Sequence, residues 1–255
     1  MTENIPTIVL MLAVAAASGL VGVFALMRKM TLASDAISHI ALPGLGLAVL
    51  LKINPLIGGA AALFLGVLLI WSIERKTEIS TETVIGVMFS ASLAVGSLLT
   101  PDEELIEVLF GGVRAPALAE SIIGIIAATA VIVFIVRMKE RLTLALVSED
   151  LATVSGVSVS RMNLLFLLVF ALNVILGLQF LGVLLMGSLI IVPAAVARNL
   201  GKSLGSTLAS AVAAAMFSVG AGYAVAAAYE LALGPAIISI AAALFFGSLF
   251  VARKG

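Results

Sequence analysis

The stretch "ASDAISHIALPG", residues 33–44, raises the central question of this sequence. It places an aspartate, Asp35, and the chain's single histidine, His39, inside an otherwise apolar segment. Ionisable residues are costly within a lipid bilayer, and by default they indicate a function there. At a spacing of four residues, the two side chains share one face of a helix, one turn apart. Pro43 and Gly44 follow directly and predict a kink or break at membrane depth.

The composition around this stretch excludes a soluble globular protein. Of 255 residues, 62% are hydrophobic and 11% are charged, whereas a soluble domain carries about a quarter charged residues. The net charge of zero offers no basic surface for nucleic acid. Cysteine is absent, which excludes thiolate metal sites and a cysteine nucleophile. The sequence therefore predicts an all-α polytopic membrane protein that forms a single transmembrane domain, residues 1–255.

Nine apolar runs are long enough to cross a bilayer, which takes roughly 20 residues. They are Ile5–Met27, Thr31–Leu51, Pro55–Ile73, Thr83–Leu99, Glu120–Val136, Met162–Leu178, Leu181–Ala197, Ser203–Glu230 and Pro235–Val251. No basic residue precedes the first run, so we expect a retained span rather than a secretory signal peptide. Polar residues and proline interrupt the second run, and the eighth is long enough to be tilted or broken. We therefore expect about eight to nine transmembrane helices.

The positions of the basic residues predict the orientation of these spans. With the N-terminus outside, the inner segments hold Arg28, Lys29, Arg75, Lys76, Arg137, Lys139, Arg141, Arg161, Arg198, Lys202, Arg253 and Lys254. Only Lys52 and Arg114 fall outside, as the positive-inside rule requires. This predicts an outer N-terminus and an inner C-terminus. The outer segment at about 101–119 alternates apolar residues with carboxylates and is expected to lie as an amphipathic helix at the outer surface.

The pair formed by Asp35 and His39 has several interpretations. Ser34 or Asp35 would serve equally well as a helix cap, with His39 a core histidine bonded to Asp35 or to a carbonyl. A functional pair of this kind suits a divalent cation such as zinc, manganese or iron(II), or else a proton relay. Two ligands are too few for a tetrahedral metal site, and no other histidine exists. A twofold dimer would double the ligands, so we expect a homodimer, or a pair with a related chain, with the path between the subunits.

Two segments resemble the permease subunits of bacterial ABC importers for zinc, manganese and iron. They are "MRKMTLASDAISHIALPGLGLAVLL", residues 27–51, and "LQFLGVLLMGSLIIVPAAVAR", residues 178–198. The resemblance implies that Asp35 and His39 contact the transported metal ion, and that no cofactor is bound permanently. It implies a multi-pass location in the bacterial cytoplasmic membrane and no enzyme activity in this chain. The implied partners are a second permease copy, two ATP-binding cassette ATPase subunits and an extracytoplasmic metal-binding protein.

The long inner segment, about 138–161, resembles the element of that family that docks on the ATPase. The resemblance rests on Glu149, Asp150, Ala152 and Gly156 within "SEDLATVSGVSVSRMN", residues 148–163. The residues alone predict a short helix from Glu149 to Val154, capped by Ser148 and ended by Gly156. An ordinary loop helix would have the same signals.

Two other transport functions stay open at this point. One is a permease for metal chelates of the cobalamin or siderophore type, although such chains are usually longer. The other is a secondary transporter that uses Asp35 and His39 as a proton relay. The remaining polar residues of the spans, Asn163, Asn173 and Gln179, are expected to hydrogen-bond neighbouring helices rather than to line the path.

Overall fold

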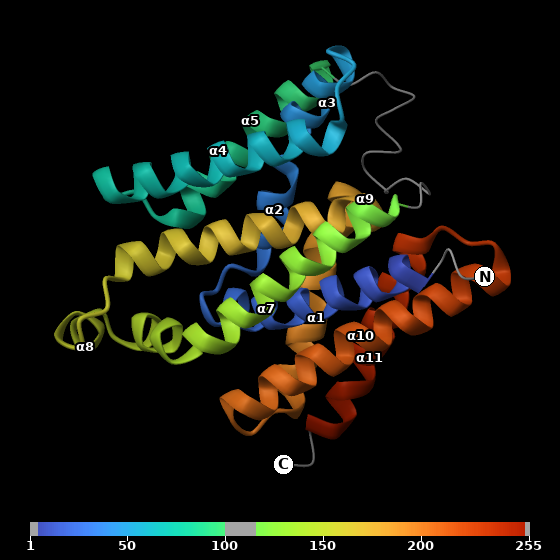
Figure 1. The fold of residues 1–255 in the computed structure, drawn as a ribbon. Coiled ribbons are helices and arrows are strands. Elements are labelled where there is room, and N and C mark those ends of the chain that lie inside the picture. The colour runs from blue at the N-terminus through green and yellow to red at the C-terminus, as the bar shows by residue number, and fades with distance from the viewer. Residues whose placement is uncertain (1–4, 100–115, 253–255) are drawn as a thin grey trace.

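The computed structural model describes residues 5–99 and 116–252, and all regular secondary structure in these ranges is helical (Figure 1). The helices are α1 (Ile5–Met27), α2 (Thr31–His39), α3 (Leu42–Leu50), α4 (Pro55–Lys76), α5 (Thr81–Leu99), α7 (Leu118–Val147), α8 (Glu149–Val154), α9 (Val159–Leu200), α10 (Leu204–Tyr229) and α11 (Leu233–Ala252). The expected outer amphipathic segment falls outside the described residues, except for its end at 116–119.

Eight stretches of helix are long and apolar enough to span a membrane in the described part of the chain. They are α1, α4, α5, α7, the two parts of α9 (Val159–Leu178 and Phe180–Leu200), α10 and α11. The all-α polytopic fold is thereby confirmed. The second expected span, Thr31–Leu51, is interrupted as the sequence predicts, because it consists of the two short helices α2 and α3.

Proline explains where this second segment breaks. Pro43 has no N–H to donate to the carbonyl of His39, and its ring clashes with that carbonyl, so α2 ends at His39. Pro43 then occupies the first turn of α3, where a missing N–H costs nothing. The break lies at Ile40 and Ala41, before the proline rather than at Pro43 and Gly44. Leu42 is already helical, although it directly precedes Pro43, a position at which proline disfavours helical geometry.

A second break divides α9 into two spans. Gly182 has φ 67° and ψ 178°, a conformation that essentially only glycine adopts. The 42 residues of α9 would extend about 63 Å as one straight helix, twice the roughly 30 Å of a bilayer's apolar core. The break therefore lets this run of helix cross twice. The eighth expected span is not broken, since α10 is one continuous helix.

The chain alternates between the two ends of the bundle. In Figure 1 the N-terminus and the α10–α11 connection lie at the right, and α3 meets α4 at the upper right. The α1–α2 connection and α8 lie at the left, and the C-terminus lies at the bottom. The short helices α2 and α3 together take the chain from one end of the bundle to the other, so they act as one membrane crossing in this alternation. Which end faces the cytoplasm stays a prediction from the basic residues.

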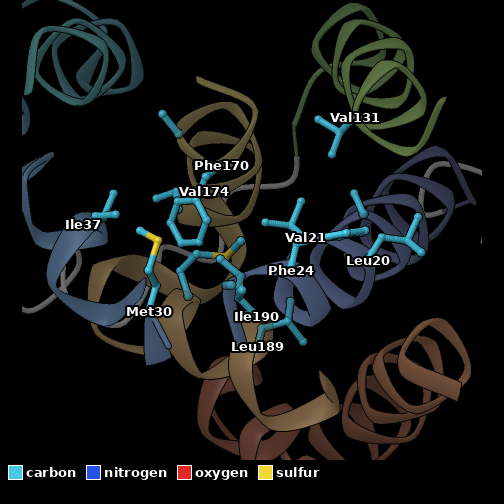
Figure 2. Packing of buried hydrophobic residues seen from close by; sticks show 14 of the residues in the cluster. Leu20, Val21, Phe24, Met30, Ile37, Val131, Phe170, Val174, Leu189 and Ile190 are labelled. Carbon is cyan, nitrogen blue, oxygen red and sulfur yellow. The ribbon is translucent and has the colours of Figure 1, made fainter. Parts of the chain in front are cut away.

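The core lies where α1 meets both parts of α9. In Figure 2, side chains of Phe24, Phe170 and Ile190 converge from these three elements. Asn173 donates a buried hydrogen bond to Ser18 of α1 (3.0 Å), as expected of a polar residue that joins two helices. Glycines allow the closest approaches, as between α3 and α4 at Gly44 and Gly58.

Candidate metal-binding site

The helix that carries Asp35 and His39 lies between two membrane spans. Helix α2 packs against α9 on one side and α5 on the other. Ile37 is fully buried, and Asp35 is half-buried. The pair thus lies within the protein, directly before a backbone break. Ile40 and Ala41 keep right-handed helical dihedral angles, and their N–H groups donate to the carbonyl oxygens three residues earlier, so the break is a tight turn rather than an extended segment.

The His39 ring is held in a defined position. Its side chain is 5% exposed, and the ring makes an edge contact with Phe89 of α5, with centroids 5.2 Å apart. Its Nδ1 lies 3.1 Å from the carbonyl oxygen of Asp35. Because a carbonyl oxygen can only accept, Nδ1 is the donor in this contact, and Nε2 is the other ring nitrogen. Histidines that bind metals commonly have this arrangement, in which the second ring nitrogen donates to a carbonyl or carboxylate.

The hydrogen bond from His39 to the carbonyl oxygen of Asp35 is also the one expected of a core histidine without a metal-binding role. It therefore does not by itself separate a structural histidine from a ligand. The contact nevertheless orients the imidazole and leaves Nε2 as the ring nitrogen that can bind a divalent metal.

The carboxylate of Asp35 lies against the second half of α9. A Cβ atom placed on Gly187 would lie 2.6 Å from the Cα of Asp35 and 2.8 Å from its Oδ1. Only a residue without a side chain permits this approach of the two helices. One turn further along α2, towards its end at His39, the Ser38 hydroxyl lies 2.9 Å from the carbonyl oxygen of Val183. Sequence reasoning missed Ser38, Val183 and Gly187, because they meet only in the folded chain.

The described residues contain no group of three or more His, Cys, Asp or Glu side chains that would hold a metal ion. Within the described residues, the candidate site therefore consists of one carboxylate and one imidazole. The arrangement can contribute two ligands of the types that zinc, manganese and iron(II) share.

The predicted short helix on the inner segment is confirmed as α8. The Ser148 hydroxyl accepts a hydrogen bond from the N–H of Leu151 (3.2 Å), and Gly156 has φ 74°. Among the residues expected to dock, Glu149, Asp150 and Gly156 are exposed, whereas Ala152 is fully buried and fixes α8 to the rest of the chain. The outward side of α8 also presents apolar side chains, with Val154 87% exposed. Sequence reasoning did not single out that apolar side.

A cavity of about 460 Å³ with both polar and apolar lining residues lies at the same end of the bundle as α8. Arg28 and Glu74 both line it, and Asn163 donates to one carboxylate oxygen of Glu74 (3.1 Å). The other oxygen, and the Nε and Nη2 of Arg28, are buried and lack a hydrogen-bond partner among the described residues. Burial lowers the pKa of Arg28 to about 10, and the nearby Glu74 carboxylate partly offsets the shift. Arg28 therefore stays charged at neutral pH, with its guanidinium 4.5 Å from the centre of the Phe166 ring.

Comparison with known protein families identifies the family of this chain. It belongs to the ABC 3 transport family, whose pattern matches residues 3–252. This confirms the resemblance carried by residues 27–51 and 178–198. The chain is accordingly a membrane permease of a transport system, as the helical fold also indicates.

Individual relatives match over most of their length. The high-affinity zinc uptake system membrane protein ZnuB of Haemophilus influenzae is 31% identical over 238 residues, which cover 90% of each chain. The manganese transport system membrane protein MntC of Listeria monocytogenes is 29% identical over 243 residues, 93% of this chain and 87% of that one.

Solved structures show the same fold. PsaBC from Streptococcus pneumoniae, in complex with Fab, matches with a TM-score of 0.86 and 27% identity, over 100% of this chain and 93% of that one. An inward-facing metal-chelate type ABC transporter matches with a TM-score of 0.73, and its 18% identity supports the fold alone.

Proposed function

We propose that this chain is the permease of an ATP-driven importer of divalent transition-metal ions, zinc or manganese in the first place and iron in the second. The observation that carries the proposal is the half-buried Asp35 beside the buried and oriented His39, directly before a helix break in a member of this family. The names of the relatives support the same ions. The chain would reside in a bacterial cytoplasmic membrane, with its C-terminus inside.

The two side chains suit a transient site for such an ion. The carboxylate of Asp35 supplies charge, and the neutral imidazole of His39 favours transition metals over calcium and magnesium, which prefer oxygen ligands. A site meant for passage must bind the ion without trapping it. Four ligands shared between two chains satisfy that requirement when a movement of the chains can separate the two pairs again.

A second copy of the chain would complete the site. Helix α5, which touches His39 through Phe89, is the least buried and the least apolar of the eight spans. Its exposed side carries the small and polar residues Gly86, Ser90, Ala91, Ala94 and Ser97. In membranes, small residues mark faces where helices pack closely. We therefore place the twofold interface, and the translocation path, on this side of α5.

The chain offers a direct test of that interface because it has no cysteine. A Ser90→Cys variant would carry one thiol, and a short crosslinker should join two copies in native membranes. The matched control is Ile123→Cys on α7, whose side chain is 66% exposed and is expected to face lipid. Efficient crosslinking of the control and none of Ser90→Cys would contradict this placement.

ATP hydrolysis would take place on two separate ATPase subunits that dock on α8. The exposed carboxylates of Glu149 and Asp150 and the exposed apolar side chains of Leu151 and Val154 form a compact contact surface. An extracytoplasmic metal-binding protein would deliver the ion at the opposite end. Movement of α8 would then switch the site between outward and inward access.

Metal uptake tests the proposed function. In cells that lack other importers of these ions, Asp35→Ala and His39→Ala should abolish uptake of zinc and manganese. Ser34→Ala is the matched control, because Ser34 is fully buried in the same helix and its hydroxyl bonds only to Met30 of that turn (2.9 Å). Normal uptake by both site variants would refute the proposal. Uptake that follows the proton gradient and ignores ATP depletion would favour the proton relay instead.

A further inference from the structure

The contact between α2 and the second half of α9 consists of two adjacent points. At the first, Asp35 lies directly against Gly187, where any Cβ would collide with its Cα and Oδ1. At the second, the Ser38 hydroxyl reaches the carbonyl oxygen of Val183. Asp35 and Ser38 are three residues apart on α2, and Val183 and Gly187 are four apart on α9. Both pairs share a helix face, so the two points form one continuous contact.

The hydroxyl of Ser38 has two acceptors within reach and only one hydrogen. It lies 2.6 Å from the carbonyl oxygen of Asp35 and 2.9 Å from that of Val183. The carbonyl of Asp35 already accepts the Nδ1 proton of His39. The hydroxyl of Ser38 is therefore shared between an acceptor on α2 and an acceptor on α9, and the contact with Val183 joins α2 to the residue that follows the Gly182 break.

We propose that Ser38 and Gly187 are positioning residues for the metal ligands and that they fix α2 to α9 at its break. This inference rests on the proposed function. Ser38 sets the rotation of α2, on which His39 is the next residue, and Gly187 sets how closely Asp35 approaches α9. Because α8 directly precedes α9, a movement of the docked ATPase reaches the ligands through α9 and this contact.

Positioning and mere structural support predict different results. Selectivity among divalent metals depends on the geometry of the ligands, so a displaced α2 changes the ratio of zinc to manganese uptake. A variant that only lowers the amount of folded protein lowers both rates together and leaves the ratio and both KM values unchanged. The ratio, measured in one culture with both isotopes, is thus independent of expression.

The experiment uses the complete importer in cells and compares Ser38→Ala with Ser34→Ala. We expect Ser38→Ala to raise KM about fivefold for at least one metal, which corresponds to one hydrogen bond of about 1 kcal/mol, and to change the ratio. Ser34→Ala and Ser38→Thr, which keeps the hydroxyl, should retain the wild-type ratio. Gly187→Ala should change the ratio as well, whereas Gly220→Ala, whose Cβ would meet nothing within 4 Å, should not.

Each outcome decides a distinct point. An unchanged ratio and unchanged KM values in Ser38→Ala overturn the inference, whether or not the amount of protein falls. If Gly187→Ala does not reach the membrane, the comparison between Ser38→Ala and Ser34→Ala still decides. Wild-type cells that take up none of zinc, manganese and iron would refute the proposed function itself, which separates that failure from a failure of the inference.

Discussion

The break at Gly182 gives the sharpest prediction about the fold. A Gly182→Ala variant must either hold alanine at φ 67° and ψ 178° or change the direction of the chain after residue 182. The second option is blocked, because the following part of α9 packs tightly on α1, where Gly22 lies against the backbone of Ile190. The backbone strain therefore remains in the folded state. Such a conformation costs a residue other than glycine on the order of 1–3 kcal/mol, which lowers the folded-to-unfolded ratio about 5- to 150-fold.

Thermal stability of the purified protein in detergent measures this loss. Gly182→Ala should lose its monodisperse form at a clearly lower temperature than the wild type. Gly220→Ala is the matched control, because it lies inside α10 with open space around its Cβ, and alanine favours a helix over glycine by up to about 1 kcal/mol. The control should be as stable as the wild type or more so. Equal stability of Gly182→Ala and the wild type would refute the account of the break.

Three further predictions concern other parts of the chain. Gly22→Ala should strongly destabilise the protein in the same thermal assay, because its Cβ would collide with the carbonyl of Ile190, which is backbone and cannot move aside; stability equal to that of Gly220→Ala would contradict this. Glu74→Gln should lower stability by about 1 kcal/mol, because it removes the charge that compensates the buried Arg28, and a more stable variant would show that the two groups do not interact. Val154→Asp should weaken co-purification of the ATPase while leaving the amount of permease in the membrane unchanged, since the side chain is 87% exposed; undiminished co-purification would place the docking contact elsewhere.

Features with local signals could be predicted from the sequence. Helix α8 is an example, because Ser148 and Gly156 mark its two ends within a few residues. The sequence predicts the break after His39 about three residues too late. The rule used there concerned the residue before proline, whereas the decisive effect of Pro43 is on the carbonyl four residues earlier.

Features that depend on distant packing could not be predicted in this way. Gly177, Gly182 and Gly187 occur at intervals of five residues and look alike in sequence, yet only Gly182 has the positive φ. Nothing local tells the hydroxyl of Ser38 from that of Ser34, since its partner Val183 lies 145 residues away. The site residues Asp35 and His39 were identifiable because ionisable groups are rare in membrane segments, but their surroundings required the fold.

The location of the metal ion tests the central claim most directly. Anomalous diffraction at the zinc edge, from crystals of the permease dimer loaded with zinc, would reveal the ion without assumptions about its ligands. The account predicts a peak between the two subunits, about 2.0–2.2 Å from a carboxylate oxygen of Asp35 and from Nε2 of His39. A zinc peak elsewhere along the path, with both side chains unliganded or directed at lipid, would contradict it.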